Sequence, residues 1–171
     1  MKLLESFFPD RMFESVYSVD PSLFHAAGIR GVILDIDNTL VSPNAPADER
    51  ACRYVASLRE AGIGCFILSN NSEKRAGSFA RDVGCGFLAK AKKPKKDGFL
   101  AAMERLGTKP SETAVIGDQL ITDVLGAHRA GIAAWCVKPL DPAHEQLFVR
   151  VKRLLEKPIF AFYRLQHKKN G

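Results

Sequence analysis

The 171-residue sequence predicts an α/β domain built on a doubly wound parallel sheet, and three observations lead to this fold class. From about residue 30 onward, short apolar runs alternate with amphipathic segments. Glycines follow these segments at positions where a helix would end. Every apolar run is far shorter than the roughly 18 residues that span a membrane. Such an alternation is typical of parallel strands covered by helices on both faces.

The apolar runs are the expected strands. In chain order they are GVILDI (31–36), CFILSN (65–70), CGFLA (85–89), TAVIGD (113–118) and AAWCV (133–137). Successive parallel strands need right-handed crossover connections, and the segments between the runs have room for a helix each.

Helical stripes at three- and four-residue spacing fill the segments between the runs. One stripe consists of Tyr54, Val55, Leu58 and Ala61, and another of Phe99, Leu100, Met103 and Leu106. The glycines that would end the helices in a left-handed C-cap are Gly62, Gly84, Gly107 and Gly131. Without repeats or low-complexity linkers, residues 1–171 are expected to form one domain, with an N-terminal extension (1–30) and a basic C-terminal tail (150–171).

Composition and charge narrow the class of protein. With 46% hydrophobic and 26% charged residues, the chain resembles an ordinary globular protein. The N-terminus lacks the pattern of a signal peptide, so we expect a cytoplasmic protein. The four scattered cysteines are interpreted as free thiols, and their spacing disfavours a zinc site. The net charge of +6 lies in the tail, where seven Lys or Arg accompany one Glu.

Polar residues follow three of the expected strands, at the edge where doubly wound sheets bind ligands. They are Asp35 and Asp37 after the first run, Ser69 and Asn70 after the second, and Asp118 after the fourth. A lysine-rich loop, 90–96, follows the third run. Taken singly, these features are also typical of strand-ending turns and solvated loops. Their arrangement at one edge favours a site.

Two aspartates that are two residues apart repel each other and need a cation when buried. Mg²⁺ binds carboxylates together with waters and phosphate oxygens, so it suits this edge. A carboxylate beside Mg²⁺ can attack a phosphoryl group, and a second one can protonate the leaving oxygen. A hydroxyl at Ser69 and a lysine would hold the phosphoryl oxygens on which charge develops.

Four segments, DIDNTL, LSNN, KKPKKDGF and GDQLITD, resemble in order the four motifs of the haloacid dehalogenase (HAD) phosphatase superfamily. The resemblance covers residues 31–137. It implies that Asp35 is the nucleophile and Asp37 the acid/base, which also ligates Mg²⁺ through its backbone carbonyl. Many relatives have glycine at the position of Asn38, and asparagine tolerates the left-handed geometry that this position requires.

The remaining motif positions follow from the same resemblance. Ser69 would bind phosphate through its hydroxyl, and Lys93 would clamp it, with Lys90, Lys92 and Lys95 as competitors. Asp118 would be a metal ligand, and Asp123 would assist the metal or hold the lysine. The expected metal set is therefore Asp35, Asp37, Asp118 and Asp123. The expected substrate-binding residues are Thr39, Asn70 and Lys93.

The motif spacing leaves no room for the cap domain that many relatives fold over small substrates. Only 31 residues separate Asp37 from Ser69, and 23 separate Ser69 from Lys93. We therefore expect a capless HAD-like, Rossmannoid domain with an open site, suited to a bulky or surface-bound phosphate ester.

A closer resemblance is to the YqeG-type branch of the superfamily (subfamily IIIA), which is similar to phosphatidylglycerophosphate phosphatases. It is carried by DIDNTLV, LSNN, the A-x-KP-x-x-x-GF pattern and GDQLITDVLGA, together with the segment before the first strand. It implies a Mg²⁺-dependent phosphatase that converts phosphatidylglycerophosphate into phosphatidylglycerol through an aspartyl-phosphate.

Three alternatives stay open. One is a phosphatase for a soluble sugar or nucleotide phosphate, or for a nucleic-acid end. A second is a phosphoryl-signalling receiver domain, which is disfavoured because Ala89 and Lys90 stand where a receiver has its aspartate. A third is a non-catalytic RNA- or ribosome-binding protein, which the complete set of acids disfavours. The oligomeric state is not predicted.

The apolar residues of the C-terminal tail can be interpreted in two ways. Its basic residues alternate with large apolar ones, and so the apolar set either packs on the domain or lies on a membrane. In the second case the aromatic residues would sit at headgroup level and the basic ones would face anionic lipid, at the inner membrane face.

Overall fold

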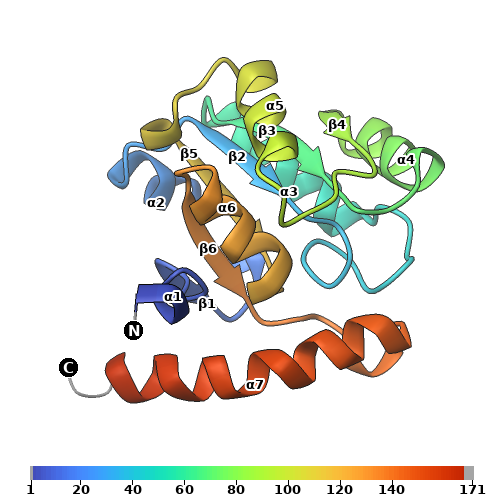
Figure 1. Cartoon of the computed structure of the whole chain (residues 1–171). Helices are drawn as coiled ribbons and strands as arrows, with labels where there is room; N and C mark the ends of the chain where they lie inside the picture. The colour runs from blue at the N-terminus through green and yellow to red at the C-terminus, as the bar shows by residue number, and fades with distance from the viewer. Residues whose placement is uncertain (1, 168–171) are drawn as a thin grey trace.

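The computed structural model describes residues 2–167, so Lys168 and Lys169 of the basic tail lie outside the described residues. Within this range the chain forms a parallel sheet between two layers of helices (Figure 1). The strands are β1 (Arg11–Phe13), β2 (Gly31–Leu34), β3 (Gly64–Leu68), β4 (Gly86–Leu88), β5 (Thr113–Gly117) and β6 (Ala133–Val137). They lie in the order β1-β6-β5-β2-β3-β4, and every pairing is parallel. The predicted fold class is confirmed.

Helices connect the strands as the sequence predicts. They are α1 (Lys2–Glu5), α2 (Pro21–Ala26), α3 (Glu49–Glu60), α4 (Glu73–Val83), α5 (Asp97–Leu106), α6 (Leu125–Arg129) and α7 (Leu147–His167). Short turns of other helical types are η1 (Val16–Ser18), η2 (Pro110–Glu112), the π-helical η3 (Leu120–Val124) and η4 (Pro142–His144). Gly84 and Gly107 cap α4 and α5 in the left-handed conformation, with φ of 72° and 65°. The predicted helix ends at these glycines are confirmed.

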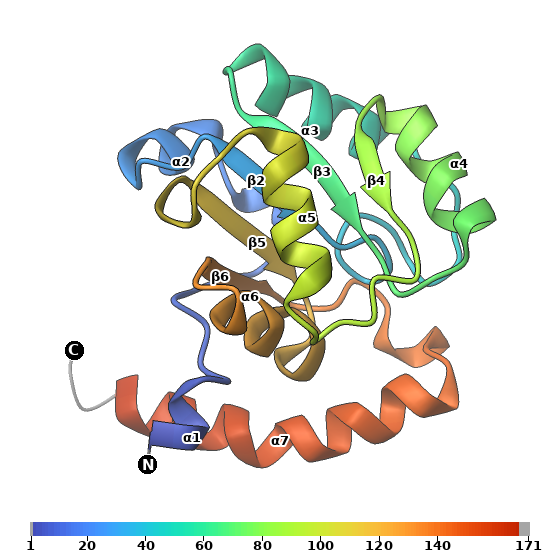
Figure 2. The ribbon, with the colours of Figure 1, turned by 45° about the horizontal axis from the view of Figure 1, so that its top comes forward.

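Side-chain alternation along the strands divides the core into two halves. Val32 and Leu34 of β2 point to the face covered by α3 and α4, whereas Ile33 points to the opposite face. Figure 2 shows α5 and α6 in front of that opposite face. Apolar runs without polar alternation are therefore required, because both faces of the central strands are covered.

Residues 2–30, the described part of the N-terminal segment, contribute a strand to the sheet and side chains to the core. Strand β1 pairs with the edge strand β6, and Phe24 from α2 is fully buried. The Phe24 ring stacks on Trp135 with 4.8 Å between centroids. The sequence pattern missed β1, since a three-residue strand is too short to display an alternation.

The order of the strands places a switch point between β2 and β5. From β2 the chain proceeds outward to β3 and β4, and it then returns to the other side of β2 with β5 and β6. The connections on either side diverge there and leave a crevice at the carboxyl ends of the two strands. Residues 35–63, all of them described, contain only a loop and α3, in agreement with the expected absence of a cap.

The tail forms most of α7, which begins at Leu147 and runs along one side of the domain with α1 beside it (Figures 1 and 2). Ile159 and Phe160 pack against the core half under α5 and α6, and the rings of Phe8 and Tyr163 are 5.6 Å apart. One face of α7 thus packs on the domain. In the described part of the chain, no helix combines the length and apolar character needed to cross a bilayer.

Replacing Phe24 with alanine tests whether the N-terminal segment belongs to the core. Phe24 is fully buried, so the variant should lose about 3–5 kcal/mol of unfolding free energy. Urea denaturation followed by circular dichroism measures this loss without relying on Trp135, whose fluorescence the substitution would change. The matched control is Phe162→Ala, at a side chain that is 51% exposed, and it should change the unfolding free energy by less than about 0.5 kcal/mol. Equal effects of the two variants would contradict the packing described for α2.

Candidate active site

The site is built around a buried lysine between two aspartates. The Lys93 Nζ atom donates to Asp35 Oδ1 at 2.6 Å and to Asp123 Oδ1 at 2.7 Å. Asp35 directly follows β2, Lys93 lies in the loop after β4, and Asp123 lies on η3 after β5. Lys93, rather than its neighbours in the loop, is therefore the lysine that reaches the carboxylates.

The turn after β5 brings Asp123 back against the end of that strand. A Cβ on Gly117 would lie 2.3 Å from the Asp123 carboxyl carbon, so only glycine allows this approach. The backbone N–H of Gln119 donates to Asp123 Oδ2 at 3.2 Å. Asp118, beside Gly117, is buried, and its carboxylate lies near those of Asp35 and Asp123.

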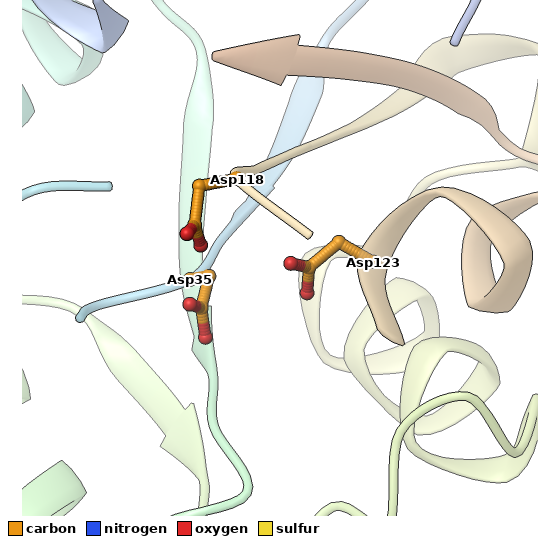
Figure 3. A group of neighbouring side chains, drawn as sticks. All are labelled: Asp35, Asp118 and Asp123. Atoms are coloured by element: carbon orange, nitrogen blue, oxygen red, sulfur yellow. The ribbon is translucent and has the colours of Figure 1, made fainter. Parts of the chain in front are cut away.

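Asp35, Asp118 and Asp123 form a compact group of carboxylates. Each offers one oxygen atom, and these atoms all lie within 4.8 Å of one another. Figure 3 shows the three side chains converging from the end of β2, the end of β5 and the following turn. Hard, buried oxygen donors at this separation fit a divalent cation such as Mg²⁺.

Burial disfavours the charged form of the carboxylates in this group. It raises the pKa of Asp35 to about 8, with Lys93 opposing the rise and Asp123 and Asp118 adding to it. It raises the pKa of Asp118 to about 7, with Arg153 opposing. Burial alone would lower the pKa of Lys93, but the charges of Asp123 and Asp35 outweigh it and raise that pKa, so the lysine stays charged. A divalent cation would supply the missing charge.

Asp37 pairs with Arg75, whereas Asp35 pairs with Lys93. The Asp37 Oδ1 atom accepts from Arg75 at 2.9 Å and from the backbone N–H of Asn44 at 2.9 Å, and Oδ2 accepts from Asn71. The idea that one metal neutralises both aspartates is therefore incomplete, because Asp37 lies beyond the end of β2 and already pairs with Arg75. The predicted metal contact through the Asp37 backbone carbonyl stays a prediction. Asn38 adopts the left-handed conformation expected of it, with φ of 63°.

Ser69, Asn70 and Thr39 occupy different positions around the carboxylates. Ser69 is buried and lines the same pocket as Asp35. Asn70 also lines it, but its side-chain amide holds the backbone of Lys93, accepting from N at 2.7 Å and donating to O at 3.2 Å. Thr39 is fully buried with its hydroxyl 3.4 Å from Asp118, so the contact observed for this residue is with a carboxylate.

Arg153 of α7 reaches into the site, a contact that the sequence did not predict. Its guanidinium donates to both carboxylate oxygens of Glu145, through Nε at 2.6 and 2.8 Å, and also to the Asp118 carboxylate. Glu145 in turn accepts from Asn38 at 2.6 Å. Nothing in the spacing marked Arg153, since it looks like one of several basic residues in the tail. The position of Arg75, one helical turn after the LSNN segment, gave a weak indication that its side chain lies near the site.

A pocket of about 220 Å³ opens over these groups. Asp35, Asp37, Ser69 and Lys93 line it, and Phe148 and Lys152 of α7 are among the other lining residues. Within the described residues α7 therefore contributes to the wall of the pocket, a contribution that the motif spacing did not predict. The volume of the pocket suits a phosphoryl group with a small part of its ester.

Comparison with known proteins finds related sequences. The model of the haloacid dehalogenase-like hydrolase family matches residues 44–131. The chain is 34% identical over 161 residues to "Probable phosphatase YqeG" of Bacillus subtilis, covering 93% of each chain. It is 28% identical over 148 residues to the chloroplastic phosphatidylglycerophosphate phosphatase 1 of Chlamydomonas reinhardtii, covering 81% of this chain and 55% of that one.

Solved structures share the fold. A HAD family hydrolase from Deinococcus radiodurans, crystallised with bound phosphate and sodium, superposes with a TM-score of 0.57 at 18% identity. The match covers 75% of this chain and 89% of that one. At this identity the likeness concerns the fold alone.

Metal binding should depend on pH in a direction set by the two raised pKa values. Because the pKa values of Asp35 and Asp118 are raised to about 8 and about 7, a cation has to displace more protons from them at pH 6 than at pH 8.5. Without metal, stability should fall as the pH rises from about 4 to 8, because the folded pKa values lie above the unfolded ones near 3.9. Excess Mg²⁺ should therefore raise the melting temperature more at pH 8.5 than at pH 6.

Differential scanning fluorimetry with and without Mg²⁺ measures this shift. Asp118→Asn should abolish most of it, and the control Asp82→Asn, at an exposed position on α4, should retain it. An equal shift at both pH values, or a full shift in the Asp118 variant, would contradict the assignment of the cluster.

Proposed function

Since the chain belongs to the haloacid dehalogenase-like hydrolases and is a phosphatase, we propose that it dephosphorylates phosphatidylglycerophosphate through a phosphorylated Asp35. The observation that carries the chemistry is the pair of contacts that Lys93 makes with Asp35 and Asp123 at the floor of the pocket. A fixed cation beside the attacking carboxylate stabilises the charge that develops on the phosphoryl oxygens.

The proposed reaction has two steps. An Asp35 oxygen attacks phosphorus as the bond to the ester oxygen breaks, and Asp37, which must enter this step in its protonated form, gives its proton to the departing oxygen. Water then attacks phosphorus, Asp37 takes a proton from it, and the Asp35–phosphorus bond breaks to release phosphate. Ser69 and Lys93 hold the phosphoryl oxygens throughout.

Each carboxylate has surroundings that suit its proposed role. Asp35 is buried, with Lys93 as its partner, so its oxygen is held in place for attack. Asp37 is only partly buried, and Asn71 and Arg75 fix its orientation at the pocket wall. A Mg²⁺ ion held by Asp35, Asp118 and the Asp37 carbonyl, with Asp123 nearby, would neutralise charge on the phosphoryl group.

The proposed substrate rests on two supports. The Chlamydomonas relative is named as a phosphatidylglycerophosphate phosphatase, and a large part of this chain aligns with it. The pocket has room for the phosphoryl end of such a lipid, and the absence of an inserted cap leaves the rest of the lipid outside. We place the enzyme at an anionic membrane surface, as a peripheral protein.

A phosphate-release assay with Mg²⁺ tests the proposal. Phosphatidylglycerophosphate in mixed micelles should give a higher kcat/KM than sugar phosphates, nucleotide monophosphates or a 5′-phosphorylated oligonucleotide. Asp35→Asn should retain less than about a hundredth of the wild-type rate, because an amide is not a nucleophile and general-acid effects alone are worth roughly 10²–10⁴. Faster hydrolysis of a soluble ester would overturn the lipid assignment. Phosphate release by the Asp35 variant at the wild-type rate would overturn the mechanism.

Asp37→Asn should separate the two steps. A nitrophenolate leaves without a proton, so the phosphorylated enzyme should form with nitrophenyl phosphate and then persist, because the variant has no base for the second step. Intact-mass measurement after acid quench detects the added phosphoryl group. An equal loss of rate with good and poor leaving groups, and no trapped species, would count against Asp37 as the acid/base.

A further inference from the structure

Helix α7 has an inward face that is partly polar and an outward face that is apolar. Its less exposed side chains follow a three- and four-residue spacing and mark the inward face: Val149, Arg153, Glu156, Phe160 and Tyr163. Glu156 is buried and accepts from the backbone N–H of Ile121 at 2.9 Å, and Arg153 contacts Asp118. These contacts fix the rotation of the helix about its axis, so the opposite side faces away from the domain.

The opposite side carries large apolar side chains at the same spacing. They are Leu147, Phe148, Val151, Leu154, Leu155, Phe162 and Leu165, each at least half exposed. We name this set the outer stripe of α7. A surface helix normally turns its apolar stripe to the core, so an exposed stripe of this size marks an interaction surface.

Charge along the stripe has one sign. Arg150 and Lys157 are exposed along one edge of it, and Lys152 lies on the other edge with its ammonium 4.2 Å from the centre of the Phe148 ring. Glu156 is the single acid of the α7 sequence, and it points inward. The described surface of α7 therefore combines apolar groups with uncompensated cations.

The stripe continues into the candidate active site. Phe148 is 67% exposed as a member of the stripe, and it also lines the pocket together with Lys152. A surface that covers the stripe would therefore meet the mouth of the pocket.

We propose that the outer stripe of α7 docks on an anionic phospholipid bilayer, so that the pocket opens onto the headgroup layer beside Phe148 and Lys152. The apolar side chains would lie at the boundary between headgroups and acyl chains, and Arg150 and Lys157 would face lipid phosphates. This inference deepens the proposed function. Binding to the bilayer does not depend on that function, but the idea that binding brings the pocket to a lipid substrate does.

A second copy of the chain fits the stripe less well. A two-fold interface would oppose each stripe to its equivalent, and the cations along its edges would meet like charges with no exposed acid of α7 to pair with. An anionic lipid surface satisfies both the apolar and the cationic groups.

Vesicle co-sedimentation of the full chain tests the docking without any catalytic step. Binding should be strong to phosphatidylcholine vesicles that contain phosphatidylglycerol, weak to phosphatidylcholine alone, and reduced by salt. Leu155→Asp, at a side chain that is 61% exposed, should weaken binding about tenfold. The matched control, Leu100→Asp on α5, starts from a leucine that is 41% exposed on another element and should bind like the wild type.

The cations are tested by a second matched pair. Removing two charges near an anionic surface should weaken binding about 25-fold, or about fivefold for each charge. We expect this loss for Arg150→Gln combined with Lys157→Gln, and no comparable loss for Lys74→Gln combined with Arg81→Gln on α4. Both stripe variants should hydrolyse a soluble ester within about twofold of the wild-type rate, and circular dichroism should show that they are folded.

Several results would overturn the docking proposal. They are equal binding to neutral and anionic vesicles, equal losses in the stripe and control variants, or a dimer that Leu155→Asp dissociates while vesicle binding is absent. Vesicle binding without hydrolysis of phosphatidylglycerophosphate would leave the docking intact and overturn the proposed function. Hydrolysis of phosphatidylglycerophosphate in micelles without vesicle binding would support the proposed function and overturn the docking.

Discussion

The ammonium group of Lys93, buried between Asp35 and Asp123, connects the segments that make up the site. Asn70, after β3, holds the backbone of Lys93, so the segments that follow β2, β3, β4 and β5 all meet at this one residue. Removing one member of a buried charged pair is strongly destabilising, because the other charge is left uncompensated. The crevice that the strand order creates is thus closed around a fixed charge, and the other carboxylates are placed relative to it.

Features encoded in a short stretch of chain could be predicted from the sequence. The central strands appear as continuous apolar runs because both faces of the sheet are covered, and polar residues that follow them mark its carboxyl edge. The left-handed Asn38 and the helix-ending glycines are local as well. Strand β1 was missed because three residues contain no pattern, and its place depends on pairing with β6, more than a hundred residues later.

Contacts between side chains that are far apart in the sequence could not be predicted from the local sequence pattern. A basic residue in an amphipathic tail has the same local pattern whether it is solvated or buried against a carboxylate, and only the path of the chain decides between the two. Arg153 shows this, since it pairs with Asp118 and Glu145 although its neighbours Arg150 and Lys157 are exposed. The same holds for Arg75 and Asp37, which pair at 2.9 Å although the sequence does not show that the two residues meet.

The inverted polarity of α7 follows from its contacts with the site. Arg153 and Glu156 must point inward to reach Asp118 and the backbone of η3, and the helical repeat then turns the outer stripe away from the core. Repacking the apolar side chains inward would require a rotation that breaks both contacts. The chain thus forms a pocket wall without an inserted cap domain, and the exposed apolar face is the structural consequence of holding that wall through polar contacts.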